Sequence, residues 1–124
     1  MKLDESLASD QGNLRLFWRD LTRNPEFLAH PWSVCEMARR CGMGVTRFTD
    51  QCKRLTNMTP IDYLNHCRVE AAARLLLDKP RLKITDVGLT CGFSSSQYFA
   101  KVFRQIKGCS PKDFRRRTLH NEGI

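Results

Sequence analysis

Gln97 and Lys101 are polar side chains of the types that recognise base edges in duplex DNA. A glutamine amide can pair with N6 and N7 of adenine, and a lysine ammonium group can donate to O6 and N7 of guanine. The two positions are four residues apart, so on a helix they lie on one face, one turn from each other. On a helix that enters the major groove, each good contact contributes about 1–3 kcal/mol of discrimination between bases.

Cysteines are the other residues that could carry chemistry; the chain has Cys35, Cys41, Cys52, Cys67, Cys91 and Cys109. They form no C-x-x-C pair and have no histidine at finger spacing, so the sequence predicts no metal site, no catalytic residue and no cofactor. The N-terminus lacks the apolar segment of a signal peptide. We therefore expect a cytoplasmic protein whose thiols are reduced and are either buried or without a role.

An internal repeat reveals the elements that must position these residues. The pairs matched at a spacing of fifty are Val34/Ile84, Met37/Val87, Ala38/Gly88, Cys41/Cys91, Gly42/Gly92 and Met43/Phe93. After a slip of one residue, Phe48, Cys52 and Pro60 match Phe99, Phe103 and Pro111. Each copy has an amphipathic helix, a glycine-containing turn and a second helix with a polar outer side, which is the pattern of a helix-turn-helix unit. Two such units predict contact with two successive stretches of duplex without dimerisation.

Apolar periodicity predicts an all-α fold of about seven helices, with two helix-turn-helix subdomains joined by a long central helix. We divide the chain into an N-terminal amphipathic helix and lead-in (1–30), a first helix-turn-helix (31–58), a linker helix (59–79), a second helix-turn-helix with a C-terminal helix (80–117) and a tail (118–124). Thr59-Pro60 and Ser110-Pro111 should each begin a helix, because the hydroxyl caps the helix and proline suits its first position.

The expected core stripes decide which side chains face outward. Burial of Phe48, Cys52 and Leu55 turns Thr46, Thr49, Asp50 and Lys53 away from the core, at about 100° per residue. Burial of Phe99, Phe103 and Ile106 does the same for Gln97, Ala100, Lys101 and Arg104. In the linker helix, the residues expected inside are Leu64, Cys67, Ala71, Leu75 and Leu76.

The charge of the chain is concentrated in the repeat. The whole chain has a net charge of +8, whereas residues 31–124 hold seventeen basic and eight acidic residues, a balance of +9. This balance favours an anionic partner. No apolar run reaches the roughly 20 residues that a membrane span needs, so we expect no membrane association.

The second copy resembles the DNA-binding domain of the AraC/XylS family of bacterial transcription regulators. The motif I-x-x-V-x-x-x-x-G-F-x-x-x-x-Y-F-x-x-x-F-+-x-x-x-G-x-S-P-x-x-F-R is present from Ile84 to Arg115. The first copy and the R-x-x-x-A-x-x-L-L of the linker agree with the same family, over residues 31–117 in all. The resemblance implies sequence-specific binding of double-stranded DNA, with two recognition helices in adjacent segments of the major groove.

The resemblance also implies site residues. The positions that match base contacts of the family are Thr46, Thr49, Asp50, Ser96, Gln97 and Lys101. We expect phosphate contacts, which position a protein without reading sequence, from Arg47, Lys53, Arg54, Arg104 and Lys107. Arg68 matches the arginine of the family's linker motif R-x-x-x-A-x-x-L-L. We expect it to be a structural ion-pair partner.

Several positions depart from the family. Gly44 stands where serine is common, Gly88 where alanine is usual, Asn57 where glycine is usual and Cys52 where phenylalanine is usual. Asp50 stands where the family often has a basic residue, and its carboxylate can be accommodated in the groove mainly by accepting from cytosine N4. We therefore expect a looser first recognition helix and a weaker second positioning helix.

Two hypotheses remain open for the whole protein. The first is a transcription regulator that binds DNA, with RNA polymerase as a further partner. The second is a DNA-repair or metal-responsive protein that uses the same domain for targeting, although the scattered cysteines favour the first. Residues 1–30 are too short for an effector-binding module, so the chain is expected to be either a stand-alone regulator or part of a longer one. A small-molecule effector is expected only if a further domain exists.

Overall fold

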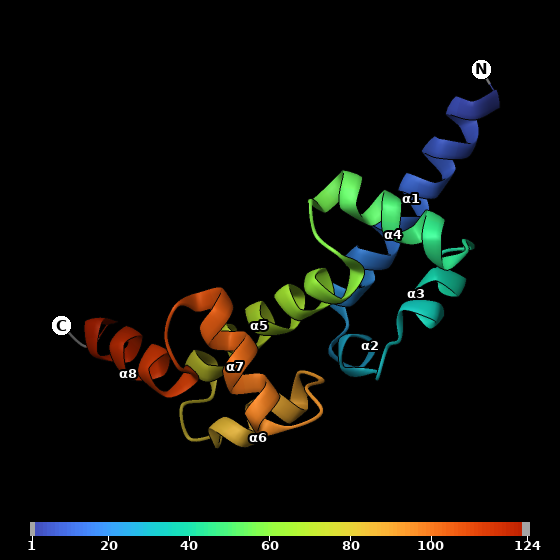
Figure 1. Ribbon diagram of the computed structural model, residues 1–124. Helices are drawn as coiled ribbons and strands as arrows, with labels where there is room; N and C mark the ends of the chain where they lie inside the picture. Colours follow the sequence, from blue (N-terminus) through green and yellow to red (C-terminus); the bar gives the residue numbers. More distant parts are fainter. Residues whose placement is uncertain (1, 123–124) are drawn as a thin grey trace.

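The computed structural model describes residues 2–122 of the chain, with side chains from Ser9 to Leu119, and this range contains eight α-helices and no strand (Figure 1). The helices are α1 (Lys2–Arg23), α2 (Pro25–Ala29), α3 (Val34–Arg40), α4 (Val45–Thr56), α5 (Pro60–Asp78), α6 (Ile84–Thr90), α7 (Ser96–Lys107) and α8 (Pro111–Glu122). The predicted all-α fold, with two helix-turn-helix units joined by a long helix, is confirmed.

The N-terminal region contains two helices, so the expected number of about seven becomes eight. Pro25 cannot continue a helix through its nitrogen, and Asn24 adopts an extended conformation before it (φ −118°, ψ 107°). The Oδ1 atom of Asn24 then accepts hydrogen bonds from the backbone N–H groups of Glu26 and Phe27, which starts α2. The C-terminal end also differs from expectation, because α8 continues through part of the segment expected as a tail and ends at Glu122.

Hydroxyl caps begin three helices, and for α5 and α8 the sequence predicts them. Oγ of Ser33 accepts from the N–H of Glu36 (3.1 Å), and Oγ1 of Thr59 accepts from the N–H of Asp62 (3.2 Å). Ser110 caps α8 in the same way. These caps satisfy N–H groups that a helix start leaves without a partner, and so fix where α3, α5 and α8 begin.

Two hydrophobic cores share α5. The first core is formed by Leu14, Phe17, Leu21, Leu28, Met37, Ala38, Cys41, Met43, Phe48 and Leu64, and the second by Val69, Ala72, Ala73, Leu76, Val87, Cys91, Phe93, Phe99, Val102 and Phe103. Among the expected α5 core residues, Leu64 and Leu76 are buried, whereas Cys67, Ala71 and Leu75 are only partly so. The reason is that α5 meets a different core at each end, so no single stripe describes its burial.

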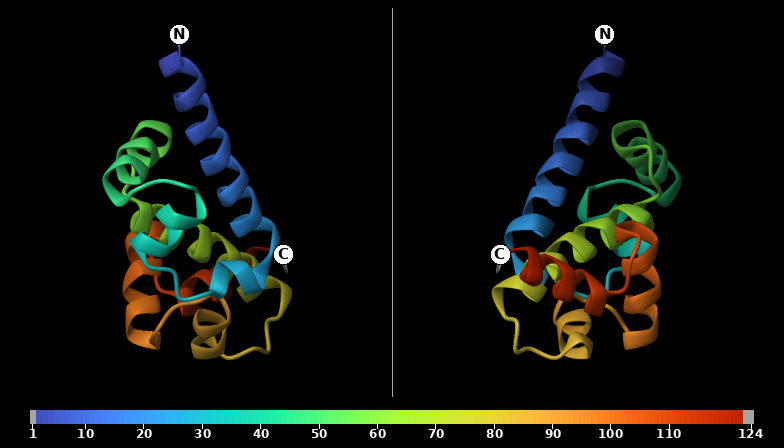
Figure 2. Two further views of the ribbon diagram at one scale, coloured as in Figure 1. Left: turned by 90° about the vertical axis from the view of Figure 1, so that its right-hand side faces the viewer. Right: turned by 90° about the vertical axis from the view of Figure 1, so that its left-hand side faces the viewer.

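Helices α4 and α7 lie on the same side of the molecule. Both are toward the viewer in Figure 1, and both lie along the same edge in each view of Figure 2. The 19-residue helix α5 separates the two units, and at 1.5 Å per residue it is about 28 Å long. The fold therefore presents two second helices, one from each unit, on one face.

Candidate nucleic-acid interface

The two turns that position α4 and α7 have the same hydrogen bonds. The N–H of Gly42 donates to the carbonyl of Arg39 (3.0 Å), and the N–H of Gly92 donates to that of Leu89 (3.1 Å). Gly42 has a φ of +74° and Gly92 a φ of +104°, conformations that a residue without a Cβ adopts easily. The next side chains, Met43 and Phe93, are buried. The internal repeat is thus a repeat of turn geometry as well as of sequence.

The two recognition helices begin differently. Ser95 precedes α7, and its Oγ accepts from the N–H of Tyr98 at 3.1 Å. Gly44 precedes α4 and provides no such bond. Glycine at this position costs roughly a few tenths of a kcal/mol of helix stability relative to serine. The first turn of α4 is therefore the less firmly held of the two, as the sequence predicts.

Gly88 allows a close approach between α6 and α7. A Cβ atom at this position would lie 2.5 Å from Cδ2 and 2.6 Å from Cγ of the buried Phe99 ring. The glycine therefore has a packing role between the positioning helix and the recognition helix. This corrects the expectation that Gly88 only weakens α6.

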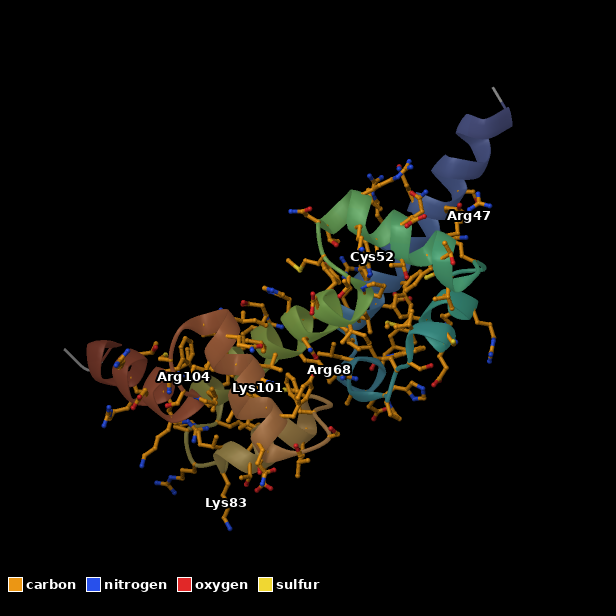
Figure 3. The ribbon with its side chains drawn as sticks, in the orientation of Figure 1. Arg47, Cys52, Arg68, Lys83, Lys101 and Arg104 are labelled. Atoms are coloured by element: carbon orange, nitrogen blue, oxygen red, sulfur yellow. The ribbon has the colours of Figure 1, made fainter. Side chains whose placement is uncertain are left out.

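Most of the expected contact residues face solvent. Exposed side chains on α4 are Thr46, Arg47, Asp50, Lys53 and Arg54, and on α7 they are Gln97, Lys101 and Arg104. Figure 3 labels Arg47, Lys101 and Arg104 among them. Thr49, Ser96 and Lys107 are partly buried. The core stripes hold as well, since Phe48, Cys52, Phe99 and Phe103 are buried, with Leu55 and Ile106 partly so. The outward faces of both helices can thus contact a ligand without unfolding.

Carboxylates of other helices already engage two of the basic residues. Arg47 forms an ion pair with Asp10 of α1. Nζ of Lys107 lies 2.6 Å from Oε1 of Glu70 on α5. To bind a phosphate, Arg47 or Lys107 must first release its carboxylate partner. Among the described residues, the predicted phosphate contacts of Lys53, Arg54 and Arg104 involve no such ion pair to break.

Besides Asp10, three polar residues are buried in contacts that the sequence pattern did not predict. Arg68 is buried, but it donates to the backbone carbonyls of Leu28 (3.1 Å) and His30 (2.7 Å), so its structural role is confirmed and the expected ion pair is wrong. Asn65 is buried too, and its Nδ2 donates to the Tyr98 hydroxyl at 2.9 Å. Gln51 of α4 is buried with its Oε1 unpartnered. A helical period of apolar residues cannot reveal such positions, because the side chains are polar.

Arg115 has an internal role at the end of α5. Its guanidinium group donates to the carbonyls of Leu76 (2.8 Å), Lys79 (3.0 Å) and Leu82 (2.8 Å). These bonds satisfy carbonyl groups where α5 ends and where the chain turns toward α6. Arg115, the last residue of the family motif, therefore joins α8 to the linker helix.

The cysteines form no disulfide among the described residues, and three of their thiols are buried enough to suppress ionisation. Burial raises the pKa of Cys41, Cys67 and Cys91 to about 11, so these thiols are protonated at neutral pH. Within residues 2–122, no group of three histidine, cysteine or acidic side chains could hold a metal ion. The same range contains no helix long and apolar enough to cross a membrane.

Comparison with known proteins identifies the domain. Residues 37–117 match the family described as "Helix-turn-helix domain". The MmsAB operon regulatory protein of Pseudomonas aeruginosa is 32% identical over 87 residues, which make up 70% of this chain and 28% of that protein. The HTH-type transcriptional activator RhaS of Escherichia coli (strain SE11) is 35% identical over 115 residues, 91% of this chain and 39% of that protein. The chain thus spans less than two fifths of the length of these curated relatives.

Solved structures agree with the fold. A transcriptional regulator with an AraC-type DNA-binding domain from Chromobacterium violaceum has a TM-score of 0.73 at 25% identity, covering 88% of this chain and 94% of that one. The DNA-binding domain of the global transcriptional factor AdpA, in complex with a target DNA, has a TM-score of 0.71 at 28% identity, covering 81% and 89%. The repeated turn, the two exposed second helices and these matches lead to one conclusion: the chain belongs to the AraC/XylS family of bacterial transcription regulators and contains its helix-turn-helix DNA-binding domain.

Proposed function

We propose that this chain binds double-stranded DNA sequence-specifically as a monomer, with α4 and α7 in adjacent segments of the major groove. The observation that supports this most strongly is the presence of both exposed second helices on one face (Figures 1 and 2). Successive major-groove segments on one side of B-DNA are about 34–36 Å apart. A linker helix of about 28 Å is of the length needed to present two helices to such segments.

In this proposal, the exposed polar residues of α7 provide the more conventional reader. Gln97 pairs with adenine, Lys101 with guanine, and Ser96 at the start of the helix adds a permissive contact. On α4, Thr46 and Thr49 contact bases, and Asp50 accepts from cytosine N4. Lys53, Arg54 and Arg104 bind phosphates, joined by Arg47 and Lys107 when these exchange their carboxylate partners.

Membership of the family supports a proposal for where this DNA binding takes place and which partner it involves. The chain would regulate transcription in the bacterial cytoplasm, and its position on a promoter would bring it into contact with RNA polymerase. The relatives are longer than the aligned domain, so a small-molecule effector would act through a further domain. The competing hypothesis of cysteine-based repair is disfavoured by the burial of three thiols with raised pKa values, because a buried protonated thiol is a poor nucleophile and metal ligand.

Footprinting tests the proposal. A preferred duplex selected from random sequences should be protected over about 15–20 base pairs by one molecule of protein, because two helices one turn apart span that length with their flanks. Replacing Gln97, Lys101 and Arg104 together by alanine should restrict protection to one segment. Arg74→Ala, which removes an exposed positive charge from α5, is the matched control and should leave the footprint unchanged. A wild-type footprint limited to one segment would contradict the proposal.

A further inference from the structure

Polar side chains of α5 contact both halves of the molecule at once. The first half is the first helix-turn-helix unit together with α1 and α2, which share its core, and the second half is the second helix-turn-helix unit. Asn65 and Arg68 are three residues apart on α5, so they share a side of the helix. Each has only 7% of its surface exposed, which is unusual for these residue types. Their partners lie in different halves, because Leu28 and His30 belong to the region before the first turn whereas Tyr98 belongs to α7.

Arg68 connects the end of α2 to the second turn. Its Nε and Nη2 atoms donate to the carbonyls of Leu28 and His30, at 3.1 and 2.7 Å. A Cβ atom on Gly92 would lie 2.7 Å from the same Nε and 2.8 Å from Cα of Ala29. Figure 3 shows Arg68 between the two units, with Arg47 on one side and Lys101 on the other. The backbone at the end of α2, the guanidinium group and the turn of the second unit are therefore in direct contact.

Asn65 connects α5 to the first turn of the second recognition helix. Its Nδ2 donates to the Tyr98 hydroxyl at 2.9 Å, and the Tyr98 ring packs edge-on against Phe93, with the ring centroids 6.0 Å apart. The backbone N–H of Tyr98 is held by Ser95. Tyr98 thus links the hydrogen-bonded start of α7 to a buried amide on the linker helix.

A polar contact of this kind favours one orientation of the parts that it joins. A buried amide or guanidinium group that moves away from its partner gives up a hydrogen bond that is favourable in only a narrow range of geometry. A surface pocket of about 270 Å³ lies beside this contact and is lined in part by Trp32, Asn65 and Tyr98. The hydrogen bonds add to the packing of Phe99 and Phe103 in opposing rotation of α7.

We propose that Asn65 and Arg68 are positioning residues that fix α7 relative to the first unit, and so set the number of base pairs between the two DNA segments that are read. This inference rests on the proposed function. One inserted base pair moves the second segment by about 3.4 Å along the duplex and turns it by about 35°. If Asn65 and Arg68 hold α7 in one orientation, the protein should bind the duplex with the insertion more weakly.

The test measures affinity for the preferred duplex and for a duplex with one base pair inserted between the two protected segments. The wild-type protein should lose at least about tenfold in affinity on insertion, equivalent to 1.4 kcal/mol. Tyr98→Phe removes only the hydroxyl, and Asn65→Leu removes only the amide. Each should reduce the insertion penalty to about threefold, and the double variant should match the single ones because they break the same bond.

Arg68→Lys provides an independent arm. Lysine keeps the charge but lacks the planar fork that reaches two carbonyl groups, so the insertion penalty should fall as in Tyr98→Phe. Arg74→Lys, an exposed position on the same helix, should keep the wild-type penalty. If Arg68→Lys fails to fold, Tyr98→Phe and Asn65→Leu decide the question.

An unchanged insertion penalty in the folded variants would overturn the inference, even if they bound every duplex more weakly, because a purely structural role lowers all affinities alike. If the wild-type protein bound no duplex selectively, the proposed function would fail and this inference with it. If the wild-type protein and all variants lost the same affinity on insertion of a base pair, the positioning role would be wrong, whereas the proposed DNA binding would stand.

Discussion

Asp50 is the residue whose charge is least suited to a surface that approaches DNA. It is exposed on α4, beside Thr46 and Lys53 on the outward face. A carboxylate repels phosphates and offers bases only an acceptor, whereas Gln97 and Lys101 on α7 offer donors. At the scale of single residues, the two recognition helices therefore differ in chemistry although their turns have the same geometry.

Asp50→Arg should tighten DNA binding and steepen its salt dependence. The change removes a negative charge and adds a positive one, so the slope of log K against log salt should become more negative by about one unit. Titrations at two salt concentrations measure this, with Asp50→Asn as the control that removes charge without adding a donor cation. A variant that binds more weakly than the wild-type protein at both concentrations would contradict an outward, DNA-facing position for Asp50.

Residues at the ends of helices also distinguish the two units. Asn57 ends α4 with a φ of +60°, and Gly108 ends α7 with a φ of +80°. Only glycine adopts this region without a steric cost, although asparagine tolerates it better than most residues. The first recognition helix thus lacks both the side-chain cap at its start and the glycine at its end.

Asn57→Gly should stabilise the protein by about 0.5–1 kcal/mol, because it relieves the left-handed conformation at the end of α4. Asn57→Ala should destabilise it by about 1–2 kcal/mol for the opposite reason. Denaturant unfolding measures both changes. Equal stabilities for the two variants would show that this helix end is not held in the left-handed conformation.

Gly88→Ala should destabilise the protein although alanine favours helix formation. The added Cβ would overlap the buried Phe99 ring, and overpacking of a core costs about 1–3 kcal/mol against a gain of about 1 kcal/mol in helix propensity. Thermal unfolding measures the net loss, and the double variant Gly88→Ala/Phe99→Leu should recover part of it. A more stable Gly88→Ala protein would mean that α6 and α7 can separate at no cost.

Elements could be predicted from the sequence where apolar spacing and caps agree, as they do for α3, α4, α7 and the starts of α5 and α8. Asn24-Pro25 also signals the split between α1 and α2, although the apolar spacing alone predicts a single helix in the lead-in. The contacts of Asn65, Arg68 and Arg115 could not be predicted, because they depend on which carbonyls and hydroxyls the fold brings near. Periodicity predicts where a side chain points, and not which partner it meets.

For the whole molecule, the positive charge should control affinity. The balance of +9 over residues 31–124 predicts that log K falls with log salt at about −0.9 per neutralised phosphate. Arg104→Ala should reduce the slope by about one unit. Arg74→Ala should leave it unchanged, because Arg74 borders a cavity formed by residues of α1, α2, α5 and α6 and by Cys91 after α6, none of them in a recognition helix. A flat salt response of the wild-type protein would mean that the basic surface is not the binding surface.

The central claim is that the outward face of α7 reads bases, and a panel of single-base variants of the preferred duplex tests it most directly. Gln97→Ala and Lys101→Ala should each cost about 1–3 kcal/mol of binding free energy, and each should relax specificity at one base position only. Arg104→Ala should instead weaken binding to every duplex in the panel by a similar factor. If Gln97→Ala and Lys101→Ala left both affinity and base preference unchanged, α7 would not lie in the major groove.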